Sequence, residues 1–249
     1  MKNLLQSVLP AKAYIYLTSS RRFIRNIGSY EISNYTLPLT GTEISFVSPK
    51  GHPWYRTIPE LPLVIEMERE LGPESVFYDI GAHFGFFSVV ATCLGAPPHN
   101  IHSFEAYPYH YYVLKKNVSH PSSHTFRAFV GDANSEINLD NYSNHHSKPT
   151  HVKIDVEGAE VEVIQGMKDL LGTHKPTLYI EIHPKEIRNL GYHTNDLLDQ
   201  LTEYGYEFQA AKHKITHELQ ENIWRPIADD LFKQDGDIMI KAYYPKSNN

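Results

Sequence analysis

The sequence predicts an α/β protein built on a mainly parallel, doubly wound sheet, and three observations support this prediction. From residue 75 onward, short apolar runs alternate with helical segments. Acidic residues and glycines follow several of these runs. The 249 residues are 41% hydrophobic, which is enough for one sizeable core. Because strands that alternate with helices form right-handed βαβ units, we expect a parallel sheet.

The first part of the chain predicts a small addition to this sheet. Residues 31–48 read as two short strands with the turn sequence LTGT between them, which indicates a β-hairpin. A helical pattern follows within 56–72 and ends at Gly72. We therefore divide the chain into an N-terminal helical and β-hairpin extension, 1–58, and a main domain, 59–249.

The segment 14–27, YIYLTSSRRFIRNI, is both apolar and basic. Two interpretations stay open for it: a helix packed on the edge of the domain, or a basic amphipathic segment in peripheral contact with a membrane surface. The apolar stretch at the N-terminus is far shorter than the about 20 residues that a membrane-spanning helix needs. We therefore expect no transmembrane segment.

The main domain alternates regularly between strands and helices. The predicted strands cover 75–80, 100–106, 124–132, 151–157, 176–183, 206–211 and 236–244. The predicted helices cover 85–95, 108–118, 159–171 and 194–205. The segment 141–149 is the most loop-like. Its adjacent histidines, His145 and His146, are candidate metal ligands, but we interpret them as solvated side chains.

Composition narrows the class of function. The net charge is −6 and the chain has no long run of Lys or Arg, so we expect no nucleic-acid partner. A single cysteine excludes a disulfide within the chain, which fits a reducing compartment such as the cytoplasm. The oligomeric state is left open.

The stretch VFYDIGAHFGFFS joins a predicted strand to a predicted helix through a glycine turn. Its candidate cofactor-binding residues are Asp79, Gly81, Ala82, His83, Gly85 and Phe86. Glycine lets the backbone approach a ligand closely and adopt positive φ. The pattern is G-A-H-F-G rather than G-x-G-x-x-G, and an acid in the turn would repel a pyrophosphate. It suits a cationic, hydroxyl-rich ligand such as S-adenosylmethionine, which has an ammonium, a sulfonium and a ribose diol.

Acids also follow the next two predicted strands. Glu105 precedes Ala106 in SFEAYP, and both are candidate cofactor contacts. An acid in this place accepts hydrogen bonds from ribose hydroxyls. Because the same is true in NAD enzymes, Glu105 alone does not distinguish an S-adenosylmethionine site from an NAD site. Asp132 in FVGDANSE is a candidate acceptor for an adenine amino group, with an Asx-turn as the alternative.

Four stretches together resemble the FkbM-type methyltransferases: VFYDIGAHFGFFS, FEAYPYHYYVLKKNV, VKIDVEGAEVEVIQGM and YIEIHP. The third stretch is the most specific. The resemblance implies a class I methyltransferase (Rossmann-like) fold, S-adenosylmethionine as the cofactor, and O-methylation of a hydroxyl on a sugar or natural product. The segment 131–151 is shorter than in many members, so we expect a more open substrate pocket on that side.

Methyl transfer requires alignment of the acceptor oxygen and removal of its proton. Two neighbouring predicted strands end in KIDVEG and EIHP, and residues two apart in a strand share one face. The candidate catalytic residues are therefore Asp155, His183, Lys153, Glu157 and Glu181. Because an unpaired charge in an apolar strand is costly, a Lys153–Glu181 ion pair is the structural alternative.

Asp155 and His183 are the candidates for proton abstraction, since a histidine has a suitable pKa for a base near neutrality. A structural hydrogen bond before Pro184 is the alternative for His183. Asp155, Glu181 and His183 are also candidate ligands for Mg²⁺ or Mn²⁺. We do not favour a metal, and we expect turnover to survive EDTA.

The leading interpretation is a methyltransferase that acts on a hydroxyl of a small molecule or glycan. Two alternatives come from other classes. One is a cofactor-binding or scaffolding domain of the same fold without catalytic activity. The other is a nicotinamide-dependent oxidoreductase, which the absence of G-x-G-x-x-G disfavours.

Overall fold

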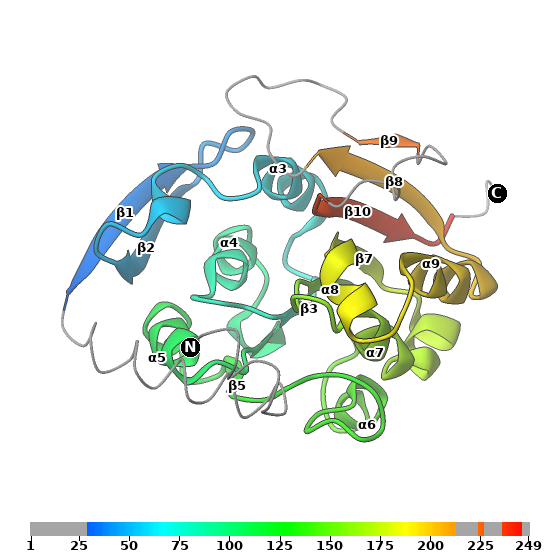
Figure 1. Ribbon diagram of the computed structural model, residues 1–249. Coiled ribbons are helices and arrows are strands. Elements are labelled where there is room, and N and C mark those ends of the chain that lie inside the picture. The colour runs from blue at the N-terminus through cyan, green and yellow to red at the C-terminus, as the bar shows by residue number, and fades with distance from the viewer. Residues whose placement is uncertain (1–28, 213–223, 227–235, 246–249) are drawn as a thin grey trace.

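The structure is a computed structural model that describes residues 29–212, 224–226 and 236–245. The segment 14–27, for which we left two interpretations open, lies outside these residues. Eight of the described strands form one sheet in the order β5-β4-β3-β6-β7-β10-β8-β9, and β1 and β2 form a separate hairpin (Figure 1).

The sheet confirms the predicted mainly parallel, doubly wound architecture. Its strands are β3 (Phe77–Ile80), β4 (Ile101–Phe104), β5 (His124–Phe126), β6 (His151–Ile154), β7 (Thr177–Ile182), β8 (Glu207–Lys212), β9 (Arg225–Pro226) and β10 (Ile238–Tyr243). The first five are parallel to one another, and β10 is antiparallel to both β7 and β8. The order reverses at β3, between β4 and β6, and ligands bind beyond the carboxyl ends of strands at such a point.

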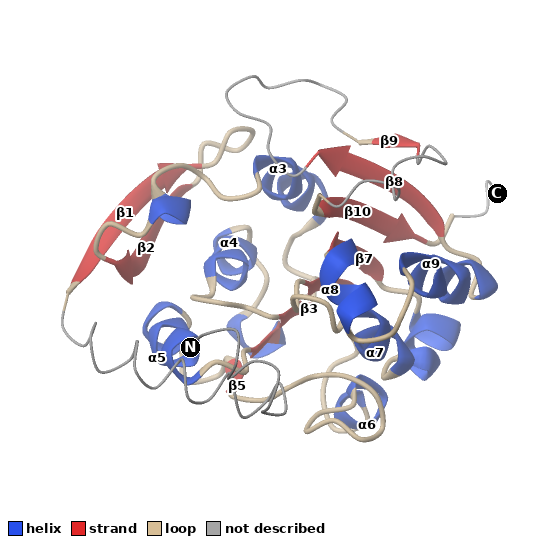
Figure 2. Cartoon of the chain, in the orientation of Figure 1, coloured by secondary structure: helices blue, strands red, loops and turns tan. Residues whose placement is uncertain are grey.

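Helices cover both faces of the sheet (Figure 2). They are α3 (Leu61–Glu70), α4 (Phe86–Cys93), α5 (Pro108–Asn117), α6 (Leu139–Ser143), α7 (Glu160–Gln165), α8 (Pro184–Asn189) and α9 (Thr194–Glu203). The short segments are η1 (Pro53–Tyr55), η2 (Pro98–Asn100) and the π-helical turn η3 (Leu170–His174). Among the described helices, none combines the length and the apolarity needed to cross a membrane.

Several element boundaries differ from the sequence prediction. β6 ends at Ile154 rather than at 157, because Glu157 and Gly158 take positive φ and leave the extended conformation. Helices α6 and α8 were not expected. The side chain of Asn138 caps α6 by accepting from the N–H of Asn141, and Pro184 starts α8 directly after β7.

The predicted strand at 124–132 and the predicted helix at 159–171 are also shorter in the structure. β5 stops at Phe126. The carbonyl oxygen of Phe126 accepts a hydrogen bond from the N–H of Glu105, the residue that follows β4. α7 ends before Gly166, where a Cβ would lie 1.9 Å from the carbonyl oxygen of Gly131. This close approach fixes the chain after α7 against the segment that follows β5.

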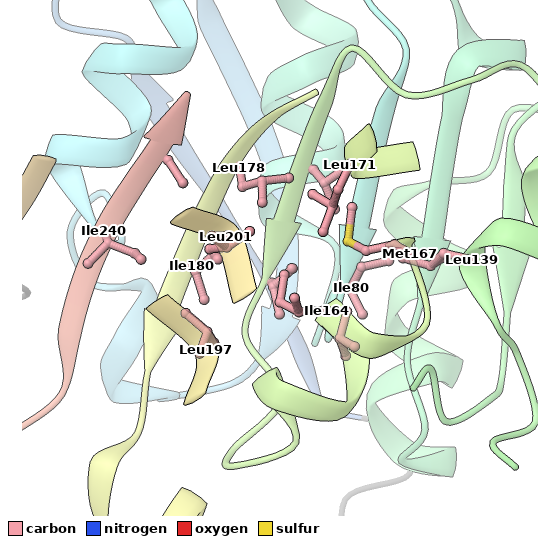
Figure 3. Packing of buried hydrophobic residues seen from close by; sticks show 14 of the residues in the cluster. Ile80, Leu139, Ile164, Met167, Leu171, Leu178, Ile180, Leu197, Leu201 and Ile240 are labelled. Carbon is pink, nitrogen blue, oxygen red and sulfur yellow. The ribbon is translucent and has the colours of Figure 1, made fainter. Parts of the chain in front are cut away.

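Two hydrophobic clusters hold the layers together. On one face of the sheet, Ile80, Ile180 and Ile240 pack with residues of α7 and α9 such as Ile164 and Leu201 (Figure 3). These side chains are fully or almost fully buried. Replacing one such Leu or Ile by Ala typically costs about 2–5 kcal/mol, so this face contributes much of the stability.

The hairpin of β1 (Tyr30–Thr36) and β2 (Glu43–Pro49) belongs to the cluster on the other face. It confirms the hairpin predicted for 31–48. Phe46 is fully buried, and its ring lies 5.3 Å from that of Phe86, the first residue of α4. The division of the chain at residue 58 stays a prediction.

One row of polar side chains crosses the sheet on this second face. Register partners run from Ser103 in β4 through Asp79, Lys153 and Tyr179 to Lys241 in β10. Register partners in neighbouring strands point to the same face. Tyr179 belongs to the cluster beneath α3 and α4, so the whole row faces those helices. Asp79 and Lys153 in this row each precede the last residue of their strand, so the row crosses β3 and β6 next to their carboxyl ends, where the candidate site lies.

Candidate active site

The glycine turn after β3 is held by the chain's own backbone. The N–H groups of Gly81 and Ala82 both donate to the carbonyl oxygen of Phe104 at 2.9 Å. Gly81 has φ +74°, and a Cβ there would lie 1.7 Å from the carbonyl oxygen of Asp155. The need for glycine therefore comes first from the close approach of the β3 and β6 ends. The sequence had suggested approach to a ligand as the reason.

Asp79 is fully buried, and one of its oxygens is satisfied within the protein. Oδ2 accepts from the hydroxyl of Ser88 at 2.6 Å, and that hydroxyl lies 2.7 Å from the hydroxyl of Ser103. Oδ1 has no hydrogen-bond partner among the described residues. Burial raises the pKa of Asp79, while the charge of Lys153 opposes the shift. An unsatisfied buried acceptor costs about 1–3 kcal/mol, so Oδ1 is a fitting place for a donor from a ligand.

Glu105 clamps the turn to the start of α5. Its carboxylate accepts from the backbone N–H of His83 at 2.8 Å and from that of Tyr107 at 2.6 Å. Ala106, between the carboxylate and Tyr107, is half-buried. Burial raises the pKa of Glu105 to about 8, and the two backbone donors oppose the shift. Because a carboxylate offers about four lone-pair sites, Glu105 retains capacity for further donors.

An aromatic group from η1 covers the turn, and the sequence interpretation missed it. The hydroxyl of Tyr55 lies 2.6 Å from Nδ1 of His83, and the ring of Trp54 lies 5.6 Å from the ring of His83. Trp54 is 62% exposed. Burial, with the neighbouring His110 and His52, lowers the pKa of His83 well below its usual value, so this ring is neutral near neutrality. These residues come from the segment PWY, which precedes the main domain in sequence.

The other predicted cofactor residues take structural positions. Gly85 has φ +86° and lies at the N-cap of α4. Phe86 is buried, and its ring lies 5.5 Å from that of Tyr35. The carboxylate of Asp132 accepts from the N–H of Asn134 at 3.0 Å and from the hydroxyl of Ser135 at 3.3 Å. This is the Asx-turn that we gave as the alternative.

Lys153 lies at the centre of the charged group and pairs with Asp155. Its Nζ lies 3.1 Å from Oδ2 of Asp155. The side chain of Lys153 is 2% exposed, and that of Asp155 is 21% exposed. Burial lowers the pKa of Lys153, but the charges of Asp155, Glu60, Asp79 and Glu181 outweigh burial and raise it. The sequence had suggested Glu181 as the ion-pair partner. In the structure the charge of Glu181 helps to raise the pKa of Lys153.

His183 follows β7 and lies among four carboxylates. Its Nδ1 is 2.6 Å from Oε1 of Glu160, and its Nε2 is 3.8 Å from oxygens of Asp155, Glu157 and Glu181. The side chain of Glu157 is 62% exposed and stands at the rim. Burial lowers the pKa of His183, but the hydrogen bond to Glu160 and the surrounding charges raise it to about 10. The imidazolium is therefore the form near neutrality, which argues against a neutral His183 as the base.

Glu160 is the second residue that the sequence interpretation missed. It is the first residue of α7 and is fully buried, with Oε1 also accepting from the N–H of Gly158 at 3.1 Å. Burial raises its pKa, while His183 opposes the shift. The signal was present in the sequence. An acid beside the buried Val161 and Val163 needs a partner, because an uncompensated buried charge is strongly destabilising.

The candidate metal ligands also converge here. One ligand atom each of Asp155, Glu181 and His183 lies within 4.8 Å of the others. Two cations already belong to this group, however: the ammonium of Lys153, 3.1 Å from Asp155, and the imidazolium of His183. A further divalent cation would be repelled by both. The arrangement therefore favours proton transfer over binding of Mg²⁺ or Mn²⁺.

Comparison with known proteins agrees with this geometry. Residues 135–208 match the family model described as the methyltransferase FkbM domain, and the match includes the KIDVEG and EIHP strand ends. No curated protein matches the chain.

Solved structures share the fold. A 16S rRNA N2 methyltransferase of T. thermophilus, RsmC, solved with AdoMet and guanosine, is similar with a TM-score of 0.50 and 12% identity over 88% of this chain and 51% of its own. A precorrin-6y C5,15-methyltransferase of Geobacter metallireducens has a TM-score of 0.49 and 16% identity over 80% of this chain and 93% of its own. A methyltransferase FkbM of Methylobacillus flagellatus has a TM-score of 0.46 and 15% identity over 70% of this chain and 44% of its own.

The sheet order, with its reversal at β3, is that of the class I methyltransferase fold. Within that fold, the match over residues 135–208 supports the resemblance to the FkbM methyltransferases that was drawn from the sequence.

Proposed function

We propose that this methyltransferase transfers a methyl group from S-adenosylmethionine to a hydroxyl oxygen of a saccharide or a related hydroxylated metabolite. The observation that carries the proposal is the position of Asp155. Its carboxylate is held by the buried ammonium of Lys153 and stays partly exposed, and its backbone carbonyl, just after β6, lies against the glycine turn. A hydroxyl acceptor needs a proton acceptor in such a place.

Asp79 and Glu105 are the residues that would hold the cofactor. The unsatisfied Oδ1 of Asp79 suits an ammonium donor, and the remaining lone pairs of Glu105 suit ribose hydroxyls. Gly81 keeps the turn between them close to β6. When bound, S-adenosylmethionine supplies an electrophilic methyl group on a sulfonium.

Asp155 is the proposed base. With S-adenosylmethionine bound, the methyl–sulfur bond would break as the acceptor oxygen takes the methyl group, which leaves a neutral thioether, and Asp155 would accept the proton of the acceptor hydroxyl and pass it to solvent. Lys153 fixes one oxygen of this carboxylate at 3.1 Å, and the imidazolium of His183 faces the other at 3.8 Å. Both cations orient the base. Glu160 in turn fixes the ring of His183 through its Nδ1.

Trp54 supports a saccharide as the acceptor. It is the most exposed of the aromatic residues around the turn, and its ring stands next to His83. An exposed aromatic face beside a polar site is a surface on which the C–H face of a sugar packs. We also keep the cytoplasm as the proposed compartment, in line with the single cysteine.

The test uses the full chain and S-adenosylmethionine with a labelled methyl group. Saccharides, hydroxylated metabolites, amines and carbon acids are offered as acceptors, and we expect label on oxygen. Trp54→Ala should raise the acceptor KM while S-adenosylmethionine affinity stays unchanged. Ile32→Ala, an equally exposed apolar residue on β1, is the control.

Each failure points elsewhere. Binding of S-adenosylmethionine without transfer to any acceptor would favour the scaffolding alternative. Label on nitrogen or carbon alone would refute O-methylation. Binding of NAD(H) in place of S-adenosylmethionine would favour the oxidoreductase.

A further inference from the structure

Three histidines gather on the face of the sheet opposite the polar row. His102 in β4 and His124 in β5 are register partners, and their rings stack with centroids 4.5 Å apart. His102 precedes Ser103 of the polar row, so strand alternation places it on the other face. The ring of His146, which follows α6, lies 5.0 Å from that of His124 and 5.5 Å from that of His102. One ring nitrogen of each histidine lies within 4.8 Å of the other two.

The nitrogen atoms of His102 are placed as they are in a metal-binding histidine. His102 is 1% exposed, and its Nε2 has no hydrogen-bond partner among the described residues. Its Nδ1 lies 2.8 Å from the hydroxyl of Tyr142 in α6. An Nδ1–H that donates to this oxygen leaves the lone pair of Nε2 free to bind a metal ion. Metal-bound histidines make such an outer hydrogen bond, which fixes the tautomer and the ring orientation.

The environment also keeps these rings neutral. Burial, followed by the charges of neighbouring histidines, lowers the pKa of His102 to about 3. The pKa values of His124 and His146 are lowered too, first by burial. Tyr142 stacks on His146 with centroids 4.1 Å apart and shields the group on the α6 side. Neutral imidazole is the form that binds a metal ion.

We propose that His102, His124 and His146 form a binding site for a divalent transition metal ion of the Zn²⁺, Co²⁺ or Ni²⁺ type. Imidazole nitrogen suits these ions, whereas Mg²⁺ and Ca²⁺ prefer oxygen. With Zn–N bonds of about 2.0–2.1 Å, tetrahedral ligands lie about 3.4 Å apart. The ligand nitrogens therefore have to close by at most about 1.4 Å from the 4.8 Å limit, and the ring of His124, which is nearly parallel to that of His102, also has to rotate so that both lone pairs meet at the metal. His146 lies in a loop and can supply this movement.

Such a site would join three separate parts of the chain. It would tie the loop after α6 to the β4–β5 edge of the sheet. Three protein ligands leave a fourth tetrahedral position for water or another ligand. The site lies on the opposite face from Lys153, so its existence does not depend on the proposed methyl transfer.

The test is titration of the full chain, prepared without a histidine tag and freed of metal by a chelator, with Co²⁺ and Zn²⁺. We expect one equivalent of Co²⁺ to bind with a visible d–d absorption, and Zn²⁺ to displace it. His124→Ala and His146→Ala should each weaken Co²⁺ binding by more than about 100-fold. Tyr142→Phe, which keeps the ring and removes the outer hydrogen bond, should weaken it by about 10- to 100-fold.

The control is His145→Ala, the exposed neighbour in the same loop, which should bind Co²⁺ like the parent. His124 and His146 are only half-buried, so their variants should fold, which circular dichroism checks. No uptake of Co²⁺, Zn²⁺ or Ni²⁺ by the folded parent would overturn the proposal. Co²⁺ binding that survives in both His124→Ala and His146→Ala would also overturn it. If His183→Ala abolishes binding instead, the metal lies at the carboxylate group around His183.

Discussion

The two lysines of the polar row lie two strands apart and are both buried, but their partners differ. Lys241 contacts Glu66 at 2.6 Å and also contacts Glu70, both on α3. The second oxygen of Glu66 accepts from Arg69, and the second oxygen of Glu70 accepts from the hydroxyl of Tyr179. Every carboxylate oxygen of this group has a donor, so the group is a closed network that fastens α3 to the sheet.

Around Lys153 the network is open. Asp79 Oδ1 and Glu160 Oε2 are buried without a hydrogen-bond partner among the described residues, and Asp155 remains partly exposed. A satisfied network stabilises and orders a core, whereas unsatisfied groups with shifted pKa values gather where ligands bind and react. The difference between the two groups favours the Lys153 side as the place where a ligand binds.

The largest effect should come from the base. Asp155→Asn should reduce methyl transfer by about 10²–10⁴, the range of a positioned general base, while S-adenosylmethionine affinity stays within a few fold. Glu70→Gln, in the closed network, should leave turnover per folded molecule unchanged. Single-turnover rates and calorimetric titrations measure both. Transfer by Asp155→Asn at the parental rate would move the base to Glu157 or to water.

Lys241→Met should break the closed network and lower the free energy of unfolding by about 3–5 kcal/mol, because it leaves two carboxylates without their common cation. Urea denaturation measures the loss. Turnover of the remaining folded protein should not change. A loss of well under 1 kcal/mol would mean that Glu66 and Glu70 are solvated, and the contrast with Lys153 would disappear.

Gly81 links β3 to Asp155, and Gly51 offers a matched control. Both have nearly the same positive φ, +74° and +73°, but a Cβ at Gly51 meets nothing within 4 Å. Alanine should cost about 1–2 kcal/mol of unfolding free energy at either site through backbone strain. Gly81→Ala should cost about 1–3 kcal/mol more through overpacking. Equal losses in urea denaturation would show that the β6 end moves freely away from the turn.

Cofactor contacts should give a smaller change. Asp79→Asn and Glu105→Ala should each weaken S-adenosylmethionine binding by about 1.5–3 kcal/mol, or roughly one to two decades in Kd, through loss of a charge-assisted hydrogen bond. Glu74→Gln, an exposed acid shortly before β3, serves as the control. Unchanged calorimetric isotherms for both variants, with the fold intact, would remove these residues from the cofactor site.

The sequence predicted the architecture because its strand and helix periods alternate clearly. It also placed Asp155, Glu181 and His183 together, since the carboxyl ends of neighbouring parallel strands share one edge of a sheet, and the structure brings these three together. Helices α6 and α8 were not predicted, because they have five and six residues, which is too short for a helical periodicity to be visible in the sequence.

Pairing within the site was less accessible from sequence. Lys153 pairs with Asp155, the residue that directly follows β6. Where a strand ends depends on backbone angles, which the amino-acid sequence does not specify directly. Tyr55 reaches His83 from a segment 28 residues earlier. Likewise, the partner of His183 depends on how α7 is rotated toward β7. Such distances arise only from the assembled fold.

Measured per pH unit, that last pair gives the smallest of the expected effects. The pKa of His183 is about 10 in the folded chain, above the unfolded value of about 6.5. Its contribution to stability is therefore fully present below pH 6.5 and is lost as the pH rises through 10, because the folded state holds a proton that the unfolded state has released. The unfolding free energy should fall across this window with a slope of at most about 1.4 kcal/mol per pH unit from this group. Glu160→Gln removes the charged partner, brings the pKa of His183 down, and should flatten the slope in urea denaturation from pH 7 to 10. Glu157→Gln removes a rim carboxylate 3.8 Å from the same ring and should leave most of the slope in place. If Glu160→Gln and the parent show the same slope, the hydrogen bond to Glu160 does not hold the proton on His183, and a neutral histidine returns as the candidate base.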